Sequence, residues 1–209
     1  MRKNTILLLL LIFGASISSL ALFAKPSIKP HAYRAGDIIF ISNPRGQGLA
    51  IQLATHSKYT HVGIILKDET GKLMVYHAVE PVSKNTIEEF ISMSADGTCE
   101  VMRLRDSTLL NENALEKLRA EATKLLGKHY DIYFGWSDSE IYCSEFVWKV
   151  YNRALALEPG PLKPLGSFDL SSPAVKQKLS ERYGNKIPME EKMISPGDMH
   201  DWKGLYRVN

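Results

Sequence analysis

The 209-residue sequence has no strong excess of charge of either sign. It contains 26 Lys and Arg residues against 23 Asp and Glu residues, and the two signs are mixed along the chain. Two of the basic residues, Arg2 and Lys3, belong to the extreme N-terminus, and without them the 26 basic residues fall to 24. A basic patch of the kind that binds nucleic acid is therefore absent from the sequence, and no nucleic-acid partner is expected.

Cysteine is scarce as well, with only Cys99 and Cys143 in the whole sequence. Two cysteines in one chain raise the question of a disulfide. Cys99, however, follows a predicted turn and leads into a strand expected over residues 100–104, whereas Cys143 begins a predicted helix. We predict that both thiols are free and that Cys99 takes no part in the chemistry.

Several other signatures are missing. The sequence has no internal repeat, no sign of a second domain, and no Gly-x-Ser-x-Gly elbow around Ser144, which disfavours a serine hydrolase. A metal site is disfavoured because His56 and His61 lie at the start of a predicted strand and no third ligand clusters near them. No metal and no cofactor are therefore expected.

Residues 1–24 have the composition of a signal peptide. Arg2 and Lys3 precede an apolar run over residues 6–12, and small residues stand near Ala21 and Ala24. The alternative is an uncleaved membrane anchor, because residues 6–24 carry no charge and are almost long enough to span a bilayer. We expect a periplasmic or secreted protein whose N-terminal segment engages the membrane during export, or alternatively an anchored protein that faces the periplasm. Residues 25–209 are then expected to form a single domain.

Cys143 stands at the start of a predicted helix whose apolar residues at 143, 146, 147, 150, 151 and 154 form one face. Unpaired N–H groups and the helix dipole at this end favour a thiolate, so we expect a lowered pKa for Cys143. Buried cysteines more often fill a hydrophobic core, and the position by itself does not establish catalysis. A nucleophile also needs a histidine beside it.

Two histidines lie at the ends of neighbouring predicted strands. His61 begins a strand rich in β-branched residues, and a second strand over residues 73–79 contains His77. Asp68, Glu69 and Gly71 mark the turn between the two strands. Since the start of the first strand of a hairpin faces the end of the second, His61 and His77 are expected to be neighbours that act as base and orienter.

The remaining elements predict an α+β fold. We expect strands over residues 38–41 and 100–104, helices over residues 48–55, 86–92, 113–126 and 171–183, and a loop-like stretch over residues 194–198. Asn85 or Thr86 is expected to cap the helix over residues 86–92. An antiparallel β-sheet, or a partial barrel, with helices packed on one face is what this order of elements builds.

These segments, in this order, resemble the YiiX/YebB-like branch of the NlpC/P60 cysteine hydrolases. The segments that carry the resemblance are Gly36-Asp37-Ile38-Ile39-Phe40, Thr60-His61-Val62-Gly63-Ile64, His77-Ala78, residues 127–131, Tyr142-Cys143-Ser144-Glu145 and residues 165–170. The resemblance covers roughly residues 33–209 and implies a circularly permuted papain-like fold. Ordinary members place the cysteine helix before the histidine strand, whereas His61 here precedes Cys143 by about eighty positions.

The resemblance implies a catalytic triad of Cys143, His61 and a polar third residue. Close relatives usually carry Glu at the third position, and this sequence departs from them with His77 there. Glu80 is the alternative orienter, and because the odd spacing puts the two on opposite faces of an extended strand, only one should point at His61.

Three further residues are candidates for a substrate cleft. Tyr130 belongs to an aromatic, polar segment that precedes the cysteine, and its alternative role is to pack that segment against the core. Tyr142 adjoins the cysteine and, with the Cys143 amide, is a candidate oxyanion donor. Glu145 either caps the helix or contacts a basic group of the substrate.

The activity implied by these residues is acyl transfer to water. We expect an exported cysteine hydrolase that cleaves an amide bond, most simply in a peptide or cell-wall peptide, through a thioester acyl-enzyme. The alternatives are a non-catalytic ligand-binding module of the same fold and a lipid acyl hydrolase or transferase, because related permuted proteins act on acyl groups of lipids. The expected partner is accordingly a peptide, a muropeptide or an acyl-lipid.

Overall fold

The structure is a computed structural model and describes residues 33–208. The predicted signal peptide or anchor and its boundary at residue 24 lie outside the described residues and stay predictions. Within residues 33–208, no helix has both the length and the apolar composition needed to cross a membrane.

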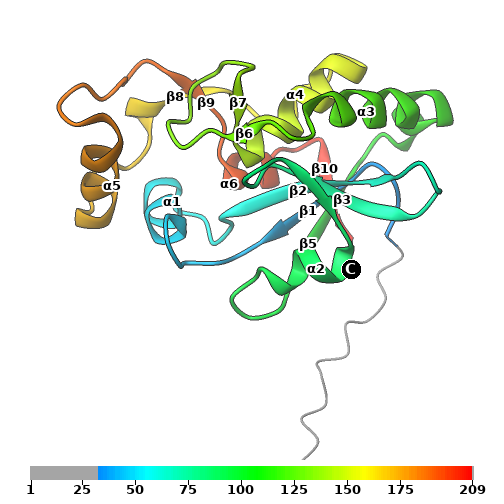
Figure 1. The fold of residues 1–209 in the computed structure, drawn as a ribbon, viewed down its shortest axis with the longest axis horizontal. Coiled ribbons are helices and arrows are strands. Elements are labelled where there is room, and N and C mark those ends of the chain that lie inside the picture. Colours follow the sequence, from blue (N-terminus) through cyan, green and yellow to red (C-terminus); the bar gives the residue numbers. More distant parts are fainter. Residues whose placement is uncertain (1–32, 209) are drawn as a thin grey trace, which may run out of the picture.

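A six-stranded antiparallel sheet forms the centre of the molecule (Figure 1). Its strands, in spatial order, are β10 (Leu205–Val208), β5 (Glu100–Leu104), β1 (Asp37–Ile41), β2 (His61–Lys67), β3 (Leu73–His77) and β4 (Ser83–Asn85). Every neighbouring pair is antiparallel. The sequence predicted the four inner strands, while the two edge strands, β4 and β10, were not predicted.

The alternation of side chains along β1 shows how the sheet is covered. Ile38 and Phe40 face one side and pack with α3 (Glu112–Leu125) and α4 (Cys143–Leu155). Ile39 and Ile41 face the other side and pack with α2 (Ile87–Ser92). Helices therefore cover both faces, as Figure 1 shows with α3 and α4 above the sheet and α2 below it, rather than the single face expected from the order of elements.

The hairpin that carries the two histidines is held by its turn. One carboxylate oxygen of Asp68 accepts hydrogen bonds from the backbone N–H groups of Thr70 and Lys72, at 2.9 and 3.0 Å. The turn sets the register in which Lys67 pairs with Leu73 and Ile64 with Tyr76. Continued towards the start of β2, this register places His77 two residues away from His61 along the sheet.

Several further elements, most of them short, lie outside the six-stranded sheet. These elements are α1 (Gly48–Thr55), β6 (His129–Tyr130), β7 (Glu140–Ile141), β8 (Lys163–Pro164), η2 (Leu165–Ser167), α5 (Pro173–Tyr183), β9 (Lys192–Met193) and α6 (Pro196–His200), while η1 (Ser107–Leu110) precedes α3. Helices α1 and α5 pack against each other at the left of Figure 1. Their apolar residues join Tyr142 in a cluster separate from the two cores of the sheet.

The stretch expected to be a loop over residues 194–198 contains the start of α6, so that prediction is wrong. The Ser195 side chain accepts a hydrogen bond from the backbone N–H of Asp198 and caps the helix, and Pro196 occupies its first turn. Both are helix-start signals that the sequence carried. They were overlooked because the helix is only five residues long.

Candidate active site

Cys143 is the first residue of α4 and lies 3% exposed beside the start of β2. The backbone N–H groups of Ser144 and Val62 interact with its sulfur, and the Tyr130 hydroxyl donates to it. Val62 is the residue that follows His61 in β2. The fold thus brings together the start of the cysteine helix and the start of the histidine strand, although about eighty residues separate them in the chain.

Burial raises the pKa of the Cys143 thiol, and the donors around the sulfur only partly oppose this effect. The direction is opposite to the one expected from the position at a helix N-terminus. The reason is that removal of the thiolate from water disfavours the charged form more strongly than the local N–H groups favour it. The raised pKa favours the neutral thiol form of Cys143 near neutral pH.

His61 and His77 form a hydrogen-bonded pair, with Nε2 of His61 2.8 Å from Nδ1 of His77. Burial and the neighbouring His77 lower the pKa of His61 well below 6.5. Burial also lowers the pKa of His77, against the opposing effect of its hydrogen bond to Asn85. The ring of Phe90, on α2, stacks on His61 and meets His77 edge-on, with ring centroids 5.4 and 5.1 Å apart.

Gly63 makes room for the histidine pair within the hairpin. A Cβ atom at this position would lie 3.1 Å from Cβ of His77 and 2.6 Å from a methyl group of Val75. A side chain at residue 63 would therefore displace β3 and the His77 ring. The glycine of the Thr60-His61-Val62-Gly63-Ile64 segment thus serves the packing of the second histidine.

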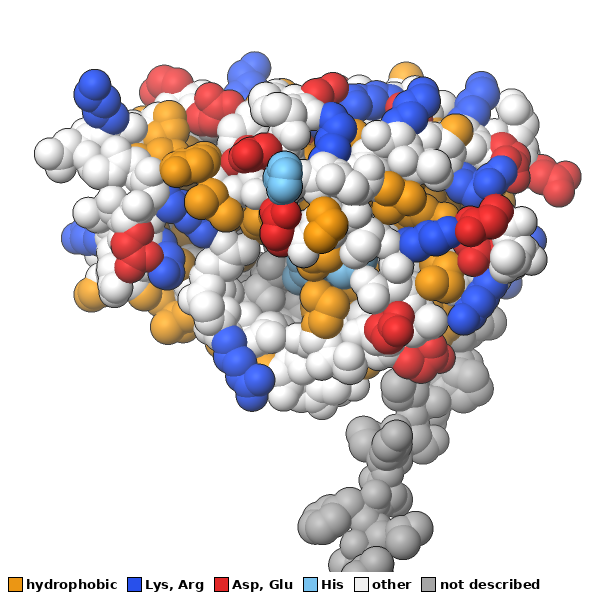
Figure 2. Space-filling view, in the orientation of Figure 1, with side chains coloured by type: hydrophobic (Ala, Val, Ile, Leu, Met, Phe, Trp, Pro, Cys, Tyr) orange, Lys and Arg blue, Asp and Glu red, His pale blue; other side chains and the backbone are white. Residues whose placement is uncertain are grey.

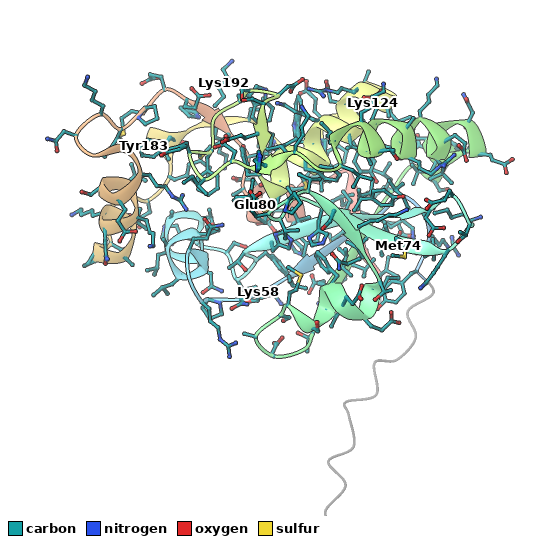
Figure 3. The ribbon with its side chains drawn as sticks, viewed as in Figure 1. Lys58, Met74, Glu80, Lys124, Tyr183 and Lys192 are labelled. Atoms are coloured by element: carbon teal, nitrogen blue, oxygen red, sulfur yellow. The ribbon has the colours of Figure 1, made fainter. Side chains whose placement is uncertain are left out.

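Glu80, the alternative orienter, does not contact His61. Its carboxylate accepts hydrogen bonds from Nδ1 of His129 and from the backbone N–H of Tyr130, both at 2.8 Å. Figure 3 shows Glu80 between the sheet and the layer of elements above it. Of the two candidates, the structure thus brings His77 to His61 and uses Glu80 to hold the start of β6.

Tyr130 and Tyr142 line the same pocket as Cys143. The Tyr130 hydroxyl accepts a hydrogen bond from Nε2 of Gln47 at 3.1 Å, which leaves its own proton for the Cys143 sulfur. The Tyr142 hydroxyl instead accepts from the backbone N–H of Ile194 at 3.1 Å. Of the two phenols, Tyr130 is therefore the one that donates a hydrogen bond to the Cys143 sulfur.

The structure decides between the two roles expected for Glu145. Its carboxylate is fully buried, accepts from the Tyr142 N–H at 3.1 Å and pairs with Lys149 at 2.6 Å. Burial raises the pKa of Glu145 to about 7, and the Lys149 ion pair opposes that shift. Glu145 caps α4 and, unlike Tyr130 and Tyr142, does not line the pocket.

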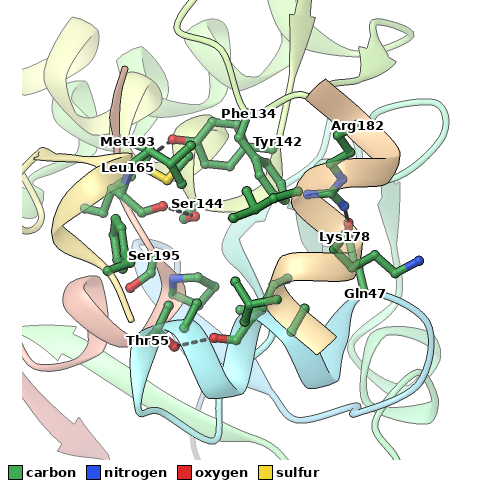
Figure 4. Close-up of a pocket in the computed structure, with 18 of the residues that line it drawn as sticks. Gln47, Thr55, Phe134, Tyr142, Ser144, Leu165, Lys178, Arg182, Met193 and Ser195 are labelled. Carbon is green, nitrogen blue, oxygen red and sulfur yellow. Dashed lines mark hydrogen bonds between the residues drawn. The ribbon is translucent and has the colours of Figure 1, made fainter. Parts of the chain in front are cut away.

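The pocket is open to solvent, spans about 740 Å³ with its mouth included, and has a mostly apolar lining (Figure 4). Much of its apolar lining comes from α1, η2, α5 and β9: Ala50, Ile51, Ala54, Leu165, Val175, Leu179 and Met193. Among the described residues, Lys178 and Arg182 of α5 are the charged side chains that line it. Arg182 lies 4.4 Å from the centroid of the Phe134 ring and donates to Gln47.

Sequence reasoning missed most of this pocket. Gln47, Arg182 and the apolar residues of α1 and α5 carry no motif, and only their packing brings them to Cys143. Asn85, which contacts His77, was considered solely as a helix cap. Figure 2 shows the surface hollowed near the centre of this face, with the pale blue of histidine side chains partly visible inside the hollow.

His56 and His61, which were weighed as metal ligands, have separate partners in the structure. Nε2 of His56 lies 3.2 Å from a carboxylate oxygen of Asp169, while His61 binds His77. Within residues 33–208, no three side chains of His, Cys, Asp or Glu are grouped so that they could hold a metal ion.

Three comparisons place this geometry among known proteins. Residues 32–209 match the model of the family described as permuted papain-like amidase enzyme, YaeF/YiiX, C92 family. The chain is 42% identical over 175 residues to "Uncharacterized protein YiiX" of Escherichia coli K12, covering 84% of this chain and 85% of that protein. It is similar to a crystal structure of "metalloprotein yiiX" from Escherichia coli O157:H7, with a TM-score of 0.80 and 42% identity over 84% of this chain and 96% of the other.

Proposed function

The chain belongs to the YaeF/YiiX family of permuted papain-like amidases, and from this membership we propose a cysteine amidase with Cys143 as nucleophile, His61 as general base and His77 as the residue that orients His61. One observation carries the assignment. The sulfur of Cys143 lies against the backbone N–H of the residue after His61, and Nε2 of His61 is 2.8 Å from His77. The nitrogen of His61 that remains for the thiol is Nδ1.

The resting site holds a neutral thiol and neutral imidazoles. Burial raises the pKa of Cys143 and lowers that of His61, so transfer of the proton before substrate binds is unfavourable. Deprotonation then accompanies attack: Nδ1 of His61 takes the thiol proton as the sulfur bonds to the carbonyl carbon of the amide. The imidazolium formed is stabilised by its hydrogen bond to His77.

Two donors are available for the oxyanion that forms on the carbonyl oxygen. The backbone N–H of Cys143 is at the N-terminus of α4, and the Tyr130 hydroxyl is directed towards the sulfur by the Gln47 donor behind it. Collapse of the intermediate breaks the C–N bond, and the imidazolium protonates the leaving amine. Water, deprotonated by His61, then hydrolyses the thioester and releases the acid and the free thiol.

The pocket favours an amide with an apolar acyl group. Polar peptide groups placed against the apolar side chains of α1 and α5 would lose their hydrogen bonds to water without replacement, at a cost of roughly 1–3 kcal/mol each. An acyl chain instead gains by burial there. An acyl-lipid or acylated amine therefore fits this pocket better than the cell-wall peptide first expected. The muropeptide stays the second candidate, because Lys178 and Arg182 offer partners for its carboxylates.

The proposal is tested by hydrolysis of fluorogenic N-acyl amides with acyl groups from acetyl to dodecanoyl, assayed beside a muropeptide digest. We expect kcat/KM to rise with chain length and to fall by roughly 10³-fold or more in Cys143→Ala. Cys99→Ala is the matched control, because Cys99 lies near Tyr33 rather than in the pocket, and it should keep full activity. Full activity of Cys143→Ala would contradict the assignment of Cys143 as the nucleophile. Binding of these substrates by the native protein without turnover would favour the non-catalytic ligand-binding module.

A further inference from the structure

Asn85 connects the histidine pair to the start of α2. It is the last residue of β4, directly before Thr86, the N-cap of α2. Its Oδ1 atom lies 2.8 Å from Nε2 of His77, and its Nδ2 atom lies 3.4 Å from a carboxylate oxygen of Glu89. In the sheet Asn85 pairs with Val75, two residues before His77 on the same face of β3. The contact thus follows from the register between β3 and β4.

Glu89 determines which end of the Asn85 amide faces His77. A carboxylate only accepts hydrogen bonds, so the end of the amide turned towards Glu89 must be the NH₂ group. The same carboxylate oxygen of Glu89 accepts the backbone N–H of Thr86 at 2.7 Å within a capping box, which holds it in place. The carbonyl oxygen of Asn85 is therefore the atom presented to His77.

The acceptor on Asn85 sets the proton positions along the whole chain of contacts. Facing a carbonyl oxygen, His77 must carry its proton on Nε2, and its neutral ring then has a lone pair on Nδ1. That lone pair accepts the Nε2 proton of His61, since two N–H groups cannot face each other across 2.8 Å. The neutral His61 ring is left with an unprotonated Nδ1, which is the form a base requires.

We propose that Asn85 is a positioning residue that fixes the tautomers of His77 and His61 and so keeps the base lone pair of His61 on Nδ1. The inference rests on the proposed function only for the role of that lone pair. It extends the triad of Cys143, His61 and His77 by one residue, and it makes the start of α2 part of the support of the site.

The test measures tautomers directly, by ¹⁵N NMR of the histidine rings in the full-length protein, together with the rate at which iodoacetamide modifies Cys143. In the native protein both rings should be protonated on Nε2. Asn85→Ala removes the acceptor, so the neutral His77 ring can carry its proton on Nδ1 instead of Nε2. That N–H would then donate to Nε2 of His61, and the proton of His61 would move to its own Nδ1. We expect Nδ1-protonated forms to appear and alkylation at neutral pH to slow by about tenfold or more.

Two further variants separate positioning from simple structural support. Thr86→Ala removes the side-chain cap of α2 but leaves the contact between Asn85 and Glu89, and it should keep the native tautomers and labelling rate. The exchange Asn85→Asp with Glu89→Gln keeps an acceptor facing His77 and a donor behind it, and it should restore both readouts even if Asn85→Ala folds poorly.

Three results would overturn the inference. The first is native tautomers with an unchanged labelling rate in Asn85→Ala. The second is a change of tautomers and labelling rate in Thr86→Ala as large as that in Asn85→Ala. The third is loss of the Nε2 tautomers in the double variant Asn85→Asp, Glu89→Gln. Failure of the proposed function gives a different result, because His61→Ala would then leave the labelling rate unchanged while the NMR spectra would still report on Asn85.

Discussion

At the residue scale, the site holds three titratable side chains in their uncharged forms. The pKa of Cys143 is raised and the pKa values of His61 and His77 are lowered, in each case chiefly because burial disfavours the charged state. The helix N-terminus and the neighbouring donors act on the thiol in the opposite direction but do not prevail. In the proposed mechanism, proton transfer from Cys143 to His61 therefore takes place during the reaction rather than before it as a preformed ion pair.

The lowered histidine pKa values predict how activity and stability depend on pH. As pH falls through 6.5, the unfolded chain binds protons on His61 and His77 while the folded protein does not. The free energy of unfolding should therefore reach its highest contribution from the two histidines above pH 6.5 and decline as the pH falls below that value. The acid limb of the kcat/KM profile should lie below pH 6.5, because His61 stays neutral there. Urea denaturation and hydrolysis assays over the same pH range measure the two effects.

A His77→Gln variant serves as the control for stability. It lacks one of the two buried titrating groups, so its free energy of unfolding should decline less steeply over the same pH range. An acid limb at or above pH 6.5 would contradict the neutral resting base.

At the element scale, a buried ion pair joins two strands of the sheet. Asp37 on β1 accepts from the Arg103 guanidinium on β5 through two hydrogen bonds of 2.6 and 2.8 Å, and both side chains are buried. The strand β1 also pairs with β2, which carries His61. The ion pair thus helps to hold β1 in the sheet, and β1 in turn pairs with β2, the strand that carries His61.

Replacement of Asp37 by Ala should be strongly destabilising. It leaves the buried Arg103 guanidinium without its carboxylate, and breaking such a pair costs about 3–5 kcal/mol. Urea denaturation measures the loss. Glu116→Ala, which breaks an exposed pair with Arg119 on α3, is the control and should leave the stability unchanged within error. Equal midpoints for Asp37→Ala and the native protein would show that the strand pairing does not depend on the ion pair.

At the scale of the whole molecule, the pocket joins elements that are distant in the chain. α1 lies before the histidine strand, α5 lies after the cysteine helix, and the two pack against each other beside Cys143. Tyr183, which Figure 3 labels on α5, also lines this pocket. Along the chain, His61 and Cys143 therefore lie between the two segments that form the apolar wall of the pocket.

Filling the pocket should separate acyl-chain binding from chemistry. Ala50→Trp puts an indole into the apolar lining, so hydrolysis of a dodecanoyl amide should fall by about tenfold or more through KM, while an acetyl amide is cleaved as before. Leu49→Trp is the matched control, since Leu49 is 46% exposed on the same helix and does not line the pocket. Equal losses for both acyl groups would indicate a disturbed fold, and no loss for either would place the acyl chain elsewhere.

Local patterns in the sequence predicted the inner strands, the long helices, the position of Cys143 at a helix start and the His61–His77 hairpin. Hydrophobic periodicity and turn residues act over a few positions, which is why they can be recognised without the fold. The order of the segments further indicated the permuted family, which the comparisons confirm. The helix α6 was also recognisable from Ser195 and Pro196, although it was missed.

The tertiary structure alone decided which groups meet and how they are charged. It directed Glu80 to His129, buried Glu145 against Lys149, brought Asn85 to His77 and built the pocket from α1 and α5. It also reversed the expected pKa shift of Cys143. The physical reason is that desolvation and hydrogen bonding depend on every group within a few ångströms, and those neighbours come from segments far apart along the chain.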